Sequence, residues 1–127
     1  MIAAAPATHQ LLDTARAFMK AEFAHEATRA RACALLVRQA LENCLDIFWS
    51  RRAPGLTSAP MRVQLLCLRE YTSDTAAADT TAQTWYELSA ACHARGYGLP
   101  PTRGALSAWI ANVESLDALL APRPPTD

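Results

Sequence analysis

The sequence predicts an all-α fold, an up-and-down four-helix bundle with one additional C-terminal helix. Apolar residues recur at steps of three and four, no stretch alternates strictly with period two, and strand-forming residues do not cluster. The chain has 127 residues, of which 51% are hydrophobic and 19% are charged, and this balance is typical of one globular domain. We therefore expect about five helices in a single domain over residues 8–121, followed by a disordered tail at 122–127.

The first two helices are expected in a segment without any Pro or Gly, residues 7–53. One unbroken helix of that length would be about 65 Å long at 1.5 Å per residue, too long for a compact domain of this size. We therefore expect a break near residues 23–28, between helices over 8–24 and 27–50. The second helix carries an apolar stripe formed by Cys33, Leu36, Val37, Ala40, Leu41, Cys44 and Phe48.

Breakers and turn residues divide the middle of the chain. The Pro54-Gly55 pair ends the second helix. A short third helix is then expected over residues 60–71, because Pro60 favours a helix start. Residues 72–81 are rich in Thr, Asp and Ala and carry no periodic pattern, which predicts a loop.

The last two helices are expected to begin at capping residues. Thr80 and Gln83 have the spacing of a capping box, so the fourth helix is expected to start there and to run to about Arg95. Thr102 is expected to cap the fifth helix, which Pro122 ends. The amphipathic stripe of the fifth helix consists of Leu106, Trp109, Ile110, Val113, Leu116 and Leu120.

Several classes of site and location are not expected from this composition. The four cysteines form no CxxC pair, and no His stands at zinc-ligand spacing from two of them, so neither a metal nor a cofactor is expected. The cysteines are instead expected to be reduced core residues. No apolar run approaches the roughly 20 residues of a membrane span, and the N-terminal start lacks the basic region of a signal peptide. A cytoplasmic protein is therefore the expectation.

Charge is balanced overall but uneven along the chain. Residues 29–69 hold seven Arg against two acidic residues, a local +5, whereas residues 70–127 hold three Arg against seven acidic residues, a local −4. Such an asymmetry can mark a surface for an acidic partner, although the high Arg and Ala content also fits a GC-rich genome. Arg51 and Arg52 beside Trp49 form a candidate contact for RNA or a protein partner. A tryptophan that caps the helix end is the alternative.

The candidate chemistry lies at the end of the fourth helix. Tyr86, His93 and Tyr97 share one stripe, and an imidazole can move the proton of an RNA 2′-hydroxyl. Cleavage also needs a cation that stabilises the charge on the phosphate. Arg95 lies about 200° around the helix from His93, so this cation would have to come from the second helix, with Arg38 one of the candidates. The alternative is a structural His93 that packs against the two tyrosines.

Residues 29–45 and the segment from His93 to Tyr97 resemble the second and fourth helices of HEPN (higher eukaryotes and prokaryotes nucleotide-binding) domains. The resemblance spans residues 8–120. It implies a helical bundle, and active members of that family are metal-independent ribonucleases in which an Arg precedes a His and two protomers line one cleft. His93 matches the His, but the positions where the Arg should lie hold Tyr86, Glu87 and Leu88.

The resemblance therefore implies a non-catalytic interaction and dimerisation module of a bacterial toxin–antitoxin or defence system, with RNA contact as a further expectation. The implied partners are a second copy of the chain, an antitoxin or a nucleotidyltransferase, and RNA. Two alternatives stay open at this point. One is a metal-independent endoribonuclease with a degenerate motif centred on His93, and the other is a purely structural helical scaffold.

Overall fold

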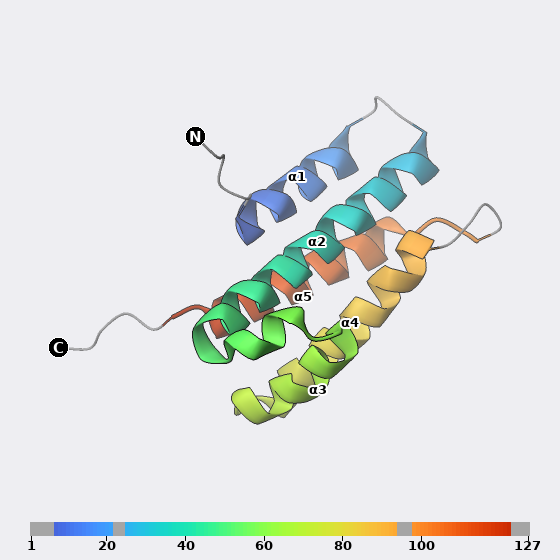
Figure 1. Ribbon diagram of the computed structural model, residues 1–127. Coiled ribbons are helices and arrows are strands. Elements are labelled where there is room, and N and C mark those ends of the chain that lie inside the picture. Colours follow the sequence, from blue (N-terminus) through green and yellow to red (C-terminus); the bar gives the residue numbers. More distant parts are fainter. Residues whose placement is uncertain (1–6, 22–24, 94–97, 123–127) are drawn as a thin grey trace.

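The computed structural model describes residues 7–21, 25–93 and 98–122, and these residues form helices without a strand. The prediction of an all-α fold with about five helices is confirmed (Figure 1). In chain order the elements are α1 (Thr8–Lys20), α2 (Glu26–Arg52), the short 3₁₀ helix η1 (Pro54–Ser58), α3 (Met61–Tyr71), α4 (Thr75–His93) and α5 (Arg103–Leu120).

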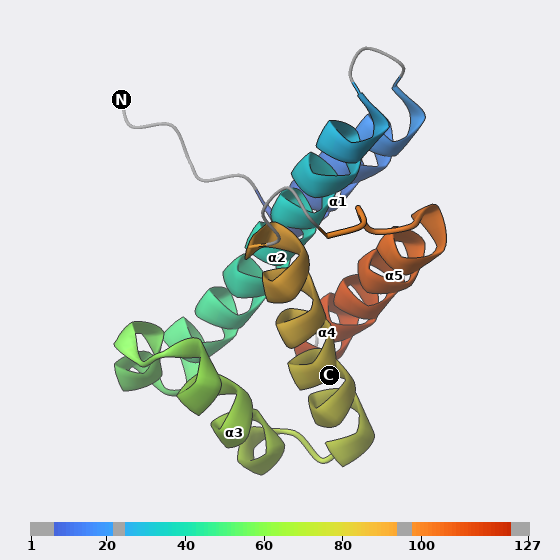
Figure 2. The same cartoon turned by 90° about the vertical axis from the view of Figure 1, so that its right-hand side faces the viewer.

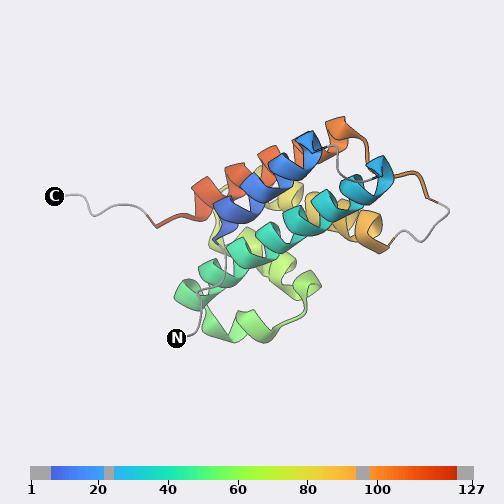
Figure 3. The ribbon, with the colours of Figure 1, turned by 90° about the horizontal axis from the view of Figure 1, so that it is seen from above.

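Four of the helices form the bundle, and α3 lies outside it. Helix α2 packs against α1, α4 and α5, and α5 also packs against α1 and α4. Figure 3 shows α1, α2 and α5 running alongside one another. Helix α3 packs on α4, on the side of α2 away from α1 (Figure 2). The C-terminal helix belongs to the bundle because α5 packs against three helices, and the additional helix is α3, which packs mainly on α4.

Helix α2 is buried around much of its circumference. The predicted apolar stripe is present, but it is widened by small residues that let neighbouring helices approach closely. The Cys33 thiol, for example, donates to the Ala15 carbonyl of α1 over 3.3 Å. The buried residues of α2 are Ala30, Cys33, Ala34, Val37, Ala40, Leu41, Cys44, Leu45, Phe48 and Trp49.

The turn between α1 and α2 falls slightly earlier than expected. Helix α1 ends at Lys20 and α2 begins at Glu26, whereas the break was expected near residues 23–28. A side chain from α2 closes this turn, because Arg29 donates a hydrogen bond to the carbonyl of Ala21, the residue that follows α1. An arginine that satisfies a free carbonyl at a helix end stabilises that end.

The loop predicted for residues 72–81 is wrong. Helix α4 already begins at Thr75, and the Asp74 carboxylate accepts a hydrogen bond from the Ala77 N–H over 2.9 Å. Asp74 is therefore the capping residue, and Thr80 lies inside the helix. The pattern was missed because this part of α4 buries small and polar residues in place of large apolar ones. The Thr84 hydroxyl, for instance, accepts from the Asn112 amide of α5.

The remaining boundaries agree with the sequence where the structure describes them. The Thr102 hydroxyl accepts from the Ala105 N–H over 3.0 Å and so caps α5 as predicted. The predicted end of the fourth helix at Arg95 and most of the predicted tail lie outside the described residues. Within the described part of the chain, none of the helices is both long and apolar enough to cross a membrane.

The four cysteines are free thiols, and two of them are core residues as predicted. Cys33 and Cys44 are buried, and burial raises their pKa values to about 11 and about 12, so both stay protonated near neutral pH. Cys67 and Cys92 are half-buried.

An aromatic cluster joins the end of α2 to the end of α3. Trp49 is fully buried, and its ring meets those of Phe48 and Tyr71 edge-on with centroids 5.0 and 5.1 Å away. Among the described residues its indole N–H has no hydrogen-bond partner, so Trp49 contributes through packing. The prediction that Trp49 contacts a partner at the surface, or caps the helix end there, is therefore wrong. The ring turns inward because Tyr71 and Phe48 complete its pocket.

Replacing Trp49 by alanine is expected to lower the free energy of unfolding by about 3–5 kcal/mol, because a large side chain leaves a cavity in the core. Leu66→Ala serves as the control, since Leu66 is 65% exposed and its loss is expected to change stability by roughly 0.5 kcal/mol or less. Urea denaturation followed by circular dichroism measures both. Equal effects of the two substitutions would contradict the core role of Trp49.

Candidate functional site

Arg38 of α2 reaches His93 at the end of α4. Nη1 of Arg38 lies 3.5 Å from Nε2 of His93, although the two residues are 55 positions apart in the chain. A guanidinium has donors only, so a hydrogen bond between these two nitrogens requires Nε2 to accept, in the tautomer with its proton on Nδ1. The structure thus brings together a cation and an imidazole that the sequence alone left separate. We call Arg38, Glu42, Trp85, Cys92 and His93 the Arg38 cluster.

Two further members of the cluster hold the guanidinium in place. Nε of Arg38 donates to Oε1 of Glu42 over 2.9 Å, and Trp85 Nε1 lies 3.4 Å from the same oxygen. The guanidinium carbon also lies 5.6 Å from the centre of the Trp85 ring, within the range of a cation–π contact. The hydrogen bond to Glu42 raises the pKa of Arg38 above its ordinary value. The side chain of Arg38 is 24% exposed, so this ion pair is partly shielded from water.

Cys92 is the thiol of the cluster, and it is not activated. Burial raises the pKa of Cys92, while the positive charge of Arg38 and a hydrogen bond from it lower that pKa in part. Since the net shift is upward, Cys92 is a thiol and not a thiolate at neutral pH. The chemistry available in the cluster therefore comes from the guanidinium and the imidazole.

Three exposed apolar residues lie on the elements next to the Arg38 cluster. Leu35 is 47% exposed and lies one turn before Arg38 on the same face of α2. Tyr86, predicted on the stripe of His93, is 50% exposed and meets Trp85 edge-on at 5.2 Å. Leu99 is 94% exposed and follows Gly98, whose carbonyl lies 3.4 Å from Nη2 of Arg31. We call Leu35, Tyr86 and Leu99 the apolar rim.

The other predicted binding residues are placed apart from the cluster. Arg51 and Arg52 lie at the far end of α2, with Arg52 fourteen residues, or about 21 Å, from Arg38. Arg51 donates to the Leu120 carbonyl of α5 over 3.0 Å. The guanidinium carbon of Arg52 lies 5.7 Å from the ring centres of both Phe48 and Tyr71. Tyr97, the remaining candidate, lies outside the described residues.

Sequence reasoning missed three members of the cluster, Glu42, Trp85 and Cys92, and one residue near Arg52. Glu42 stands four residues after Arg38, the spacing of a helical ion pair, so this partner was visible in the sequence. Trp85 could not be assigned, because its contact with Glu42 crosses from α4 to α2. Tyr71 was overlooked because the end of α3 comes beside the end of α2 only in the folded chain.

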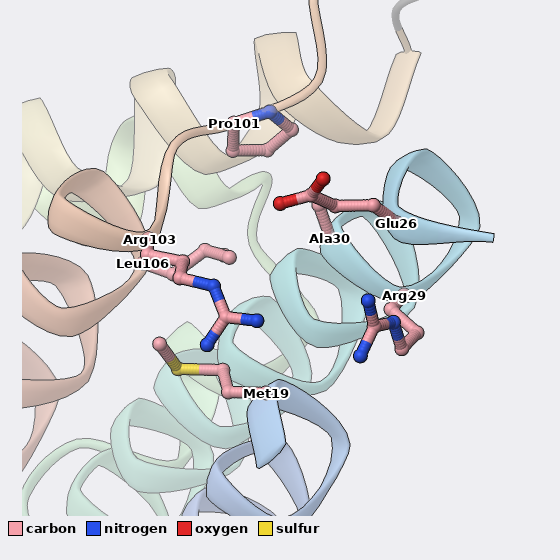
Figure 4. Close-up of a pocket in the computed structure, with 7 residues that line it drawn as sticks. All are labelled: Met19, Glu26, Arg29, Ala30, Pro101, Arg103 and Leu106. Atoms are coloured by element: carbon pink, nitrogen blue, oxygen red, sulfur yellow. The ribbon is translucent and has the colours of Figure 1, made fainter. Parts of the chain in front are cut away.

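A small pocket where α1, α2 and α5 meet does not form a comparable site. It offers about 30 Å³ of space, roughly that of one or two water molecules. Figure 4 shows the guanidinium groups of Arg29 and Arg103 on its two sides and the Glu26 carboxylate turned into it. Arg29 already binds the Ala21 carbonyl, so its position is explained by the turn that it closes.

In the described part of the chain, no three His, Cys, Asp or Glu side chains are grouped so that they could hold a metal ion. Comparison with protein-family models, curated proteins and solved structures gives no match. The resemblance to HEPN domains and the catalytic role of His93 therefore stay predictions, and the geometry of the Arg38 cluster carries the argument about function.

The link between Arg38 and Cys92 predicts how thiol reactivity depends on pH. Arg38→Met removes the charge that lowers the pKa of Cys92 and keeps much of the side-chain volume. The midpoint of the alkylation rate against pH should therefore move upward for this cysteine, because the thiolate is the reacting form. Mass spectrometry of the iodoacetamide-labelled peptide that contains Cys92 measures the alkylation rate at each pH. Arg51→Met is the control and should leave the midpoint unchanged, and an unmoved or lowered midpoint in Arg38→Met would contradict the contact.

Proposed function

We propose that this chain is a non-catalytic HEPN-like module that pairs with a second copy through the face around the Arg38 cluster and contacts RNA through its basic segment, residues 29–69. The proposal rests on the contact between the side chains of Arg38 and His93. Nε2 of His93 faces Nη1 of Arg38 at 3.5 Å, and Nε of Arg38 is bound by Glu42. Both groups are thereby used to join α2 to α4.

This engagement argues against catalysis. A general base needs a ring nitrogen within hydrogen-bond reach of the 2′-hydroxyl, and Nε2 of His93 is already directed at Arg38. A phosphate-stabilising cation acts best when its charge is not compensated nearby, and the Glu42 carboxylate compensates that of Arg38. The cluster therefore suits a structural link at a surface better than it suits a transition state.

The apolar rim supports pairing with a second copy. Leu35, Tyr86 and Leu99 expose about half or more of their surface beside partly buried polar groups. Exposed apolar residues gathered on one face mark an interaction surface, and in a two-fold dimer the same patch serves both subunits. The assignment to a bacterial toxin–antitoxin or defence system, with an antitoxin or nucleotidyltransferase as partner, rests on the resemblance to HEPN domains.

A metal-independent endoribonuclease is the second candidate, and one observation favours it. The Arg that is missing before His93 in the sequence is replaced in space by Arg38 from α2. In this alternative an RNA phosphate takes the place of the Glu42 carboxylate on the guanidinium, since both are bound by the same fork of donors. His93, released from Arg38, then takes the proton of the 2′-hydroxyl.

The pairing proposal predicts a dimer that depends on the apolar rim. Leu35→Glu should convert the dimer to a monomer, because it places a charge among the apolar side chains of the proposed interface. Ile47→Glu is a matched control, since Ile47 is also 47% exposed on α2 but lies about 120° around the helix from Leu35. Light scattering coupled to size-exclusion chromatography measures the mass. A monomeric wild type, or equal effects of both substitutions, would overturn the proposed interface.

The proposal also predicts no cleavage of labelled RNA above background in the presence of EDTA. The assay compares wild type with His93→Ala and Arg38→Ala, and with Arg103→Ala as a control outside the cluster. Cleavage by the wild type and the control that both cluster substitutions abolish would replace the leading proposal by the ribonuclease. Loss of folding in the two cluster variants, seen as a lower melting temperature without any cleavage by wild type, would agree with a structural link.

A further inference from the structure

A second polar pocket opens at the end of the bundle away from His93. It has a volume of about 320 Å³ and lies where the ends of α2, α3 and α5 meet Thr72 and Ser73, which connect α3 to α4. The side chains that give it its polar character come from Arg51, Arg52, Tyr71, Thr72 and Ser73. The pocket lining contains two cations, two aliphatic hydroxyls and no acidic residue.

Both guanidinium groups are held in place without a carboxylate. In the described part of the chain, no Asp or Glu oxygen lies within 4.0 Å of Arg51 or Arg52, whereas Arg16, Arg38 and Arg69 each have such a partner. Arg51 is anchored by the Leu120 carbonyl, and Arg52 by the rings of Phe48 and Tyr71. Neither guanidinium is therefore ion-paired within 4.0 Å in this part of the chain, and both side chains are preorganised, which reduces the entropy lost when an anion binds.

The nearest acidic side chain on the α4 side is used elsewhere. The Asp74 carboxylate accepts from the Ala77 N–H and caps α4. Its negative charge offsets the positive end of the dipole of α4, so the start of this helix does not add to the positive charge of the pocket. The groups in the pocket that favour an anion are its two guanidinium groups, whose forks match the geometry of a phosphate.

We infer that this pocket is a phosphate-binding site for single-stranded RNA, in which Arg51 and Arg52 bind the backbone phosphate and Tyr71 orients Arg52. The inference rests on the RNA contact of the proposed function and locates it at one end of the molecule. The pocket works separately from the Arg38 cluster, because Glu42 and Asp46 on the intervening part of α2 interrupt any continuous path of positive charge.

The test is fluorescence anisotropy with a short labelled oligouridine. The variant Arg51→Ala with Arg52→Ala is expected to bind on the order of tenfold more weakly and to show a smaller dependence on salt, because each lost phosphate contact lowers the salt slope by about 0.7 for a single strand. The double variant Lys20→Ala with Arg103→Ala is the matched control, since it removes the same charge from exposed positions outside the pocket and outside the basic segment. Equal weakening in both would overturn the site.

A second double variant separates binding from the stability of the helix end. Arg51→Lys with Arg52→Lys keeps the charges near the end of α2 but removes the forks, and it is expected to bind RNA several-fold more weakly than wild type at an unchanged melting temperature. Wild-type affinity in this variant would overturn the guanidinium contact. The lysine variant also tests the guanidinium contact if the alanine variant unfolds.

Competition with uridine monophosphate and with inorganic phosphate distinguishes a strand from a free nucleotide. Both are expected to displace the oligouridine only in large excess, and displacement by equimolar nucleotide would overturn the assignment to a strand. Light scattering on the same samples distinguishes the two proposals. A dimer that binds no RNA would remove this site and the RNA contact but leave the pairing proposal, whereas a monomer that binds RNA through Arg51 and Arg52 would do the reverse.

Discussion

The burial of α2 is the constraint on which the rest of this molecule depends. Ten of its residues are buried, and they are spread around the helix because α1, α4 and α5 all pack against it. A helix enclosed in this way cannot carry polar residues except where a neighbour leaves it open or supplies a partner. The charged side chains of α2 are therefore confined to the margins between neighbouring helices, and their positions follow from the packing of the core.

Both candidate sites arise at such margins. Arg38 and Glu42 lie at the edge between α2 and α4, where Trp85 and His93 supply polar partners from α4. Arg51 and Arg52 lie in the last turn of α2, where the helix leaves the bundle and the ends of three other helices converge. The two sites differ in whether a carboxylate forms an ion pair with the arginine. Arg38 is ion-paired with Glu42, whereas Arg51 and Arg52 have no carboxylate within 4.0 Å in the described part of the chain.

Apolar periodicity was sufficient to predict α1, α2, α3 and α5, because in each of them large apolar residues mark the buried face. It failed at the start of α4, where Ala78, Thr81 and Thr84 are buried and a core of small residues leaves no amphipathic pattern. Trp49 was misplaced for a related reason. Its position at the end of α2 suggested exposure, but the pocket that encloses it is completed by Tyr71, 22 positions later in the chain.

The contact between Arg38 and His93 marks the limit of a local motif search. A guanidinium and an imidazole can be brought together by a short interval on one helix or by the packing of two helices, and only the first leaves a trace in the sequence. When they come from two helices, each brings the neighbours on its own helix with it. Arg38 brings Glu42, which follows it by one turn on α2 and forms an ion pair with it. The helix that brings a cation to His93 therefore also neutralises that cation, and the competition between Glu42 and a phosphate for one guanidinium separates a structural link from a catalytic pair.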